Sequence, residues 1–168
     1  MLRQILKVLK ALNSNAKPWQ LSLGVCFGAV IGLTPLASLH NLALLFLALV
    51  INMNIGIMIL SAVVFSGIAY LMDPVFHSAG LAILKSGSLT GFWENVFSSP
   101  IALVAKLNNS IVMGSLVISI LLAVPLFFFF NLFVKKYREV FLTYMERFPI
   151  FKSLKILKVY QTLMGEKG

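Results

Sequence analysis

The chain has 168 residues, of which 60% are hydrophobic and only 11% are charged, and its formal net charge is +9. Charged residues are about a quarter of an ordinary soluble domain, so this composition excludes that class and indicates a single all-α membrane domain. The single cysteine, Cys26, excludes an internal disulfide and a cysteine-rich metal site. The basic residues lie mostly outside the apolar segments, so we read them as topology signals and expect no nucleic acid partner.

Residues 1–18 are predicted to form a basic amphipathic helix. Leucine and isoleucine side chains of residues 1–13 share one face, whereas Arg3, Lys7 and Lys10 share the other. Such a helix beside an apolar segment typically lies among the headgroups of an anionic leaflet. A solvated lead-in to the first membrane segment explains the pattern equally well.

A membrane domain is predicted over residues 19–134, built as a compact helical bundle. Residues 19–72 contain no Lys, Arg, Asp or Glu. Pro35 interrupts this stretch, because proline removes a backbone donor and disfavours helical angles at the preceding residue. Four apolar segments result: 19–33, 36–51, 55–72 and 110–134. The last is long enough to span a bilayer, and the third is nearly long enough.

The first two segments, 19–33 and 36–51, are each shorter than the about 20 residues that a spanning helix needs. They therefore form either two short spans or a re-entrant hairpin, which enters and leaves on the same side. Their shortness slightly favours the hairpin.

The stretch 73–109 mixes polar and apolar residues, and the stretch 135–168 is basic. We expect the third segment to end at Asp73-Pro74, with Asp73 capping a following short helix. Residues 75–84 and 100–107 suit short helices at the membrane interface. Residues 135–168 are predicted to form basic amphipathic helices in the cytoplasm or at the interface.

The basic residues also predict the topology. Twelve of the fourteen Lys and Arg residues lie on the two tails, four before Trp19 and eight after Val134. The positive-inside rule places such tails in the cytoplasm, so the number of crossings must be even. Both arrangements of the first two segments satisfy this condition, and both put residues 73–109 on the outer side.

Three glycines, Gly24, Gly28 and Gly32, recur every four residues in the first segment. This spacing gives a smooth strip on which another helix backbone can pack closely. We interpret it as a helix-packing strip, with the lining of a substrate path as the less favoured alternative.

A polar cluster lies between the first two segments and comprises Thr34, Pro35, Ser38, His40 and Asn41. If both segments cross the membrane, this cluster is an ordinary outer turn. In a re-entrant hairpin it lies deep in the membrane, where non-helical backbone must be buried in protein or face a wet cavity. Broken helices of that kind bind solutes in transporters, so the cluster is a candidate substrate or lipid site.

Three further residues, Asn52, Asn54 and Asp73, complete the candidate site. Asn52 and Asn54 separate the second and third segments and suit a tight turn. Asp73 is a candidate proton or cation site if it is buried, although its place at the outer boundary favours a capping role. We expect no catalytic residue, no cofactor and no metal site.

These features resemble one known family. The pattern G-V-C-F-G-A-V-I-G-L-T-P, the later I-N-M-N and the run A-Y-L-M-D-P-V-F-H-S-A-G are similar to domain of unknown function 2062, in particular to a subgroup of conserved hypothetical inner-membrane proteins. The likeness covers roughly residues 18–130. It implies a bacterial inner membrane and supplies no activity, substrate or catalytic residue.

Two functions compete on the sequence alone. The first is a non-enzymatic accessory or interaction subunit of a membrane complex, with basic tails on anionic lipids and a protein partner or further copies of itself. The second is a small transporter or lipid-handling protein that uses residues 19–51 as a gate. A membrane enzyme is disfavoured, because Asp73 and Glu94 lack a paired histidine, cysteine or metal-like arrangement.

Overall fold

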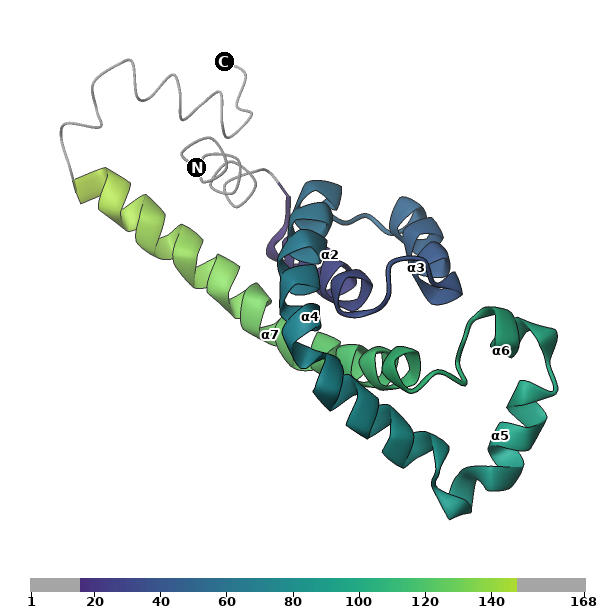
Figure 1. Cartoon of the computed structure of the whole chain (residues 1–168). Helices are drawn as coiled ribbons and strands as arrows, with labels where there is room; N and C mark the ends of the chain where they lie inside the picture. The colour runs from purple at the N-terminus through teal and green to yellow at the C-terminus, as the bar shows by residue number, and fades with distance from the viewer. Residues whose placement is uncertain (1–15, 148–168) are drawn as a thin grey trace.

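The computed structural model describes the backbone of residues 16–147 and the side chains of residues 16–140. Over that range all the regular secondary structure is helical (Figure 1). Most of the predicted N-terminal helix and the chain beyond residue 147 lie outside the described residues. The elements, in chain order, are α2 (Pro18–Leu33), α3 (Leu39–Val50), α4 (Ile55–Leu84), the 3-10 turn η1 (Gly87–Leu89), α5 (Thr90–Phe97), α6 (Pro100–Val104) and α7 (Ser110–Arg147).

Three helices, α2, α4 and α7, pack on one another and form the bundle. The contacts of α2 advance along α4 in the same direction, from Gly24 beside Asn54 to Gly32 beside Ser66, so these helices run parallel. Helix α7 runs the opposite way, since its start contacts Gly80 of α4. Further along α7, Val134 shares a buried cluster with Leu21 and Ile57 at the starts of α2 and α4.

Helix α3 connects the end of α2 to the start of α4, and it packs mainly on α2. Its buried Ala48 joins a small core with Ile31 of α2 and Met58 of α4. Most of its other side chains are large, apolar and exposed. In Figure 1 α3 accordingly stands to one side of the bundle, joined to it by two short connections.

The helix ends follow from local chemistry. Pro18 occupies the first turn of α2, where its missing N–H costs nothing. Thr34 ends α2 in extended backbone, as expected for a residue before proline. The side chain of Asn54 caps α4 by accepting a 3.0 Å hydrogen bond from the Ile57 amide.

The sequence predicts that the third apolar segment ends at Met72, but α4 is longer. Helix α4 continues through Pro74 to Leu84, so the expected cap at Asp73 and the separate helix over 75–84 were wrong. Most residues after Pro74 are apolar, and Phe76 and Gly80 are buried. This packing outweighs the one backbone hydrogen bond that proline removes.

Helix α7 also extends further than expected, because it continues through Pro125 and past Val134 to Arg147. Figure 1 shows that α4 and α7 both change direction along their length, as expected for helices with an internal proline. In the mixed stretch 73–109, α6 ends at Val104, short of the expected 107.

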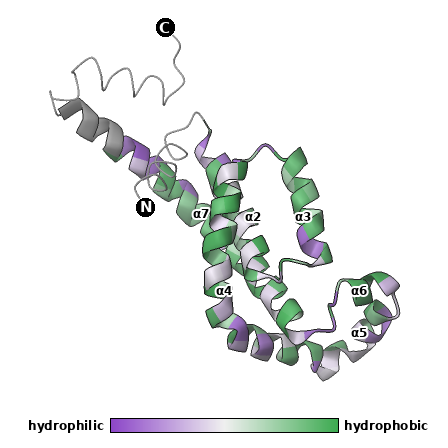
Figure 2. Cartoon of the chain, turned by 45° about the horizontal axis from the view of Figure 1, so that its top comes forward, coloured by the Kyte–Doolittle hydropathy of each residue, from purple (hydrophilic) through white to green (hydrophobic). Residues whose placement is uncertain are grey.

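Most residues of the bundle helices are hydrophobic (Figure 2), and many of their large apolar side chains are exposed. Within the described residues, two helices are long and apolar enough to cross a membrane, over Ile55–Leu84 and Ser110–Val140. Helices α2 and α3 are also apolar but shorter. Two long and two short apolar helices thus agree with the segment lengths expected from the sequence.

Candidate functional site

The glycines of α2 lie directly on the backbone of α4. A Cβ atom added at Gly28 would overlap the carbonyl oxygen of Met58, and one at Gly32 would overlap that of Ala62. At Gly24 the added atom would lie 2.7 Å from the Asn54 carbonyl oxygen. All three are therefore places where only glycine allows this approach of the two helices.

A second close crossing joins α4 to α7 through Gly80 and Gly114. A Cβ at either glycine would overlap the opposite backbone, at Ser110 and at Phe76 respectively. Sequence reasoning did not find Gly114, because a lone glycine in an apolar helix carries no spacing signal. Nearby, the Ser110 hydroxyl lies 2.7 Å from His77 Nδ1 and ties the start of α7 to α4.

The polar turn between α2 and α3 is organised by Asn41, which is buried. Its amide nitrogen donates to the carbonyl oxygens of Ile31 at 3.3 Å and Pro35 at 3.1 Å. Its side-chain oxygen lies 2.9 Å from the Thr34 hydroxyl, which is also 2.8 Å from the Val30 carbonyl oxygen. Asn41 therefore satisfies backbone groups that the end of α2 leaves without helical partners.

The other members of the polar cluster are less enclosed. Pro35 is exposed, and Ser38 and His40 are half-buried. The Ser38 hydroxyl lies 2.9 Å from His40 Nε2, whereas Nδ1 of His40 is buried without a hydrogen-bond partner. The structure thus brings the five predicted turn residues together, with one ring nitrogen left unsatisfied.

The remaining three predicted residues separate into two places. Asn52 and Asn54 lie at the end of α3 away from the polar turn. There the backbone N–H of Asn54 donates to the Gln20 carbonyl oxygen at 3.2 Å. Asp73 is half-buried and lines a cavity of about 330 Å³ together with Thr34 and Pro35. Asp73 therefore belongs with the turn, and the two asparagines do not.

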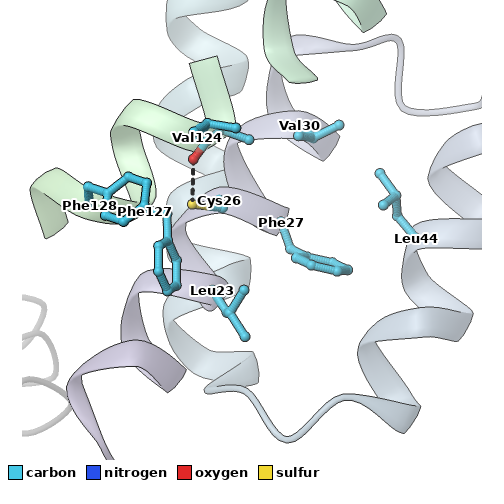
Figure 3. Close-up of a pocket in the computed structure, with 9 residues that line it drawn as sticks. Leu23, Cys26, Phe27, Val30, Leu44, Val124, Phe127 and Phe128 are labelled. Atoms are coloured by element: carbon cyan, nitrogen blue, oxygen red, sulfur yellow. Dashed lines mark hydrogen bonds between the residues drawn. The ribbon is translucent and has the colours of Figure 1, made fainter. Parts of the chain in front are cut away.

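One feature that the sequence did not predict is an apolar groove lined by α2, α3 and α7. Two adjoining cavities, of about 290 and 350 Å³, share Val30, Leu44 and Ala123. Figure 3 shows Leu44 of α3 across the open space from Phe27 and Val30, with Phe127 and Phe128 of α7 beyond them. We call this feature the α3–α7 groove.

Polar groups at the α3–α7 groove are few. The Cys26 thiol donates to the Ala123 carbonyl oxygen at 3.2 Å, which links α2 to α7 (Figure 3). His40 lines the groove at the end near the polar turn. The lining is otherwise apolar, so the groove suits an apolar segment or chain.

The described residues do not assemble a recognisable metal centre. Among them, no three His, Cys, Asp or Glu side chains lie close enough together to hold a metal ion. The polar atoms that cluster at the turn chiefly bond to backbone.

Comparisons with known proteins give one family and one relative. A family model described as "Uncharacterized protein conserved in bacteria (DUF2062)" matches residues 2–141. An "Uncharacterized protein" of Treponema pallidum (strain Nichols) is 25% identical over 138 residues, which cover 82% of this chain and 85% of that protein. No solved structure matches the chain.

Proposed function

The chain belongs to the DUF2062 family of bacterial proteins, and from this premise we propose that it is a multi-pass inner-membrane protein that acts as an accessory or interaction subunit. In this role it catalyses no reaction and binds a partner protein, or further copies of itself, within the bilayer. Its basic tails hold it to anionic lipids of the cytoplasmic leaflet.

The observation that carries this proposal is the position of α3. This helix has 12 residues, so it is roughly 18 Å long against a hydrocarbon core of about 30 Å. It packs mainly on α2 and leaves the apolar α3–α7 groove beside it. A helix from a partner would bury the exposed face of α3 and fill this groove by close van der Waals packing.

The arrangement of the helix ends supports the proposed orientation. The starts of α2 and α4 lie together with Val134, and Arg138 donates to the Ala16 carbonyl oxygen at 2.9 Å. The two basic tails therefore leave the bundle at the same end, as two cytoplasmic tails require. Residues 73–109 then belong to the outer side.

The level of the polar turn supports the re-entrant form of α2 and α3. Helix α2 ends near Ser66, and α4 continues from there to Leu84, which is roughly 27 Å of further helix. A turn at that level lies inside the membrane. The two bonds from Asn41 to backbone carbonyl oxygens meet the requirement that polar backbone in the membrane be satisfied by protein.

A second function, transport or lipid handling with α2 and α3 as a gate, is favoured by one specific observation. His40 lines the α3–α7 groove and carries a buried ring nitrogen without a partner. Because α3 packs mainly on α2, it is the helix that can move with least disruption of the bundle.

Crosslinking in cells tests the first function. A photoreactive phenylalanine analogue replaces Phe46, which is 64% exposed on α3, and in a control chain it replaces Leu71, which is 78% exposed on α4. We expect a crosslink of one defined mass from position 46 only, and the captured protein should also copurify in fixed stoichiometry. Co-expression of two differently tagged chains identifies a second copy.

A groove-filling variant makes this experiment sharper. Leu44→Trp should abolish the crosslink from position 46, because the larger ring occupies the space intended for the partner helix. Crosslinks to lipid alone, or equal protein capture from both positions, would contradict the accessory function. Lipid adducts confined to position 46 would favour the second function.

A further inference from the structure

A second apolar groove lies on another side of the bundle, where α2, α4 and α7 meet. Its volume is about 340 Å³, and its walls include Phe130 and Phe133 of α7. Its lining runs along α4 from Ile57 to Phe65, which is roughly 12 Å of helix. We call it the α4–α7 groove.

The lining of the α4–α7 groove is almost entirely apolar. Ser61 is its one hydroxyl side chain, and that hydroxyl donates to the Val25 carbonyl oxygen at 2.9 Å. With this bond made, the groove presents methyl, methylene and aromatic groups. A hydrocarbon chain is therefore the type of ligand that it accommodates without leaving a polar group unpaired.

One end of the groove lies beside positive charge. Leu21 and Val134 line the groove at this end. Lys17, the N-cap residue of α2, lies four residues before Leu21, and Arg138 lies four residues after Val134 on α7. The bond from Arg138 to the Ala16 carbonyl oxygen joins α7 to the residues just before α2. Lys135 and Lys136 are exposed directly after Val134, and Glu139 is the first acidic residue after them on α7.

From this juxtaposition we propose that the α4–α7 groove binds one anionic phospholipid. An acyl chain lies in the groove along α4, and the phosphate lies at the basic end formed by Lys17, Lys135, Lys136 and Arg138. Basic pockets between membrane helices on the cytoplasmic side suit lipid phosphates, and an apolar groove that ends at such a pocket selects the whole molecule. The inference rests on the proposed membrane location and adds a defined lipid site to it.

The charge also argues against a second copy as the occupant. A symmetric dimer through this groove would bring two identical basic ends together, and like charges at short distance repel. A free phosphate ion has no group that fills the apolar groove. The anionic lipid is the occupant that matches both parts of the surface.

The test measures which lipid the full chain retains. The protein is reconstituted in nanodiscs of equal parts phosphatidylcholine and phosphatidylglycerol, and native mass spectrometry after release counts the bound lipids. We expect one retained phosphatidylglycerol, preferred about tenfold over phosphatidylcholine. Val64→Trp, which fills the groove, should remove this lipid, whereas Val63→Trp, on the 68% exposed neighbour outside the groove, should retain it.

A charge variant tests the other half of the site. Lys17→Gln combined with Lys135→Gln and Lys136→Gln should abolish the preference, and it leaves the Arg138 contact in place. Lys85→Gln with Lys106→Gln, away from this groove, is the matched control.

Equal retention of both lipids by the wild type, unchanged retention by Val64→Trp, or a second copy in place of lipid would overturn the inference. Loss of the membrane location itself would appear separately, as release of the protein from membranes by alkaline carbonate.

Discussion

Single residues decide how closely the helices approach. The four-residue spacing of Gly24, Gly28 and Gly32 predicts a packing strip, and in the structure each glycine lies against a carbonyl oxygen of α4 or of its N-cap residue. The partner surface could not be predicted, because the sequence does not say which helix runs beside α2. The role of Asn41 was equally hidden, since its two carbonyl partners come within reach only when the turn folds.

The glycine strip gives a prediction with an internal control. Gly28→Ala should lower the free energy of unfolding by about 1–3 kcal/mol, because the added methyl group forces α2 away from α4. Gly67→Ala is the control: its Cβ would meet nothing within 4 Å, and alanine favours a helix by about 0.5–1 kcal/mol over glycine. Thermal unfolding in detergent measures both, and equal melting temperatures would show that the strip does not control packing.

At the scale of whole helices, three prolines in similar apolar surroundings have different effects. Pro35 follows the end of α2, where Thr34, Asn41 and the polar turn satisfy the backbone. Pro74 and Pro125 lie inside α4 and α7, whose apolar residues continue on both sides. From the sequence, a helix end was expected at Pro74 as at Pro35. The contacts of Phe76 and Gly80 that hold α4 together come from α7, and the sequence does not show that α7 lies beside them.

The depth of the α2–α3 turn can be measured directly. In a Cys26→Ala background, a cysteine at Ser38 should resist an impermeant maleimide applied to intact cells, whereas one at Ser88 in η1 should react. The Ser38 cysteine should become reactive in inverted vesicles, because a re-entrant turn opens only toward the cytoplasm. Equal labelling of both positions in intact cells would contradict the hairpin and make the polar cluster an outer loop.

At the scale of the whole molecule, the sequence predicted the family and the long apolar helices but neither of the two grooves. The family resemblance is confirmed by the match over residues 2–141. The two long apolar helices follow from continuous apolar segments, which composition and length reveal. Neither groove was predicted, because each is lined by helices far apart in the sequence and its shape depends on how they cross.

The topology is a property of the whole chain and has its own test. Reporter fusions after Gly168 and at Ser88 should give opposite compartments, with the carboxyl terminus in the cytoplasm, since basic tails are retained on that side. A fusion at the amino terminus should match the one after Gly168. Signals from the same compartment at positions 168 and 88 would contradict the even number of crossings.

The order of the contacts has a consequence for how the protein is made. The bond from Ser61 to Val25 joins residues 36 apart, whereas the bond from Cys26 to Ala123 joins residues 97 apart. Because a chain folds from its amino-terminal part as it leaves the ribosome, α2, α3 and α4 can pair while α7 is still being translated. Both grooves need α7 as a wall, so they are the last surfaces to form during biosynthesis, and a chain stalled before Ser110 carries the glycine contacts without a binding groove.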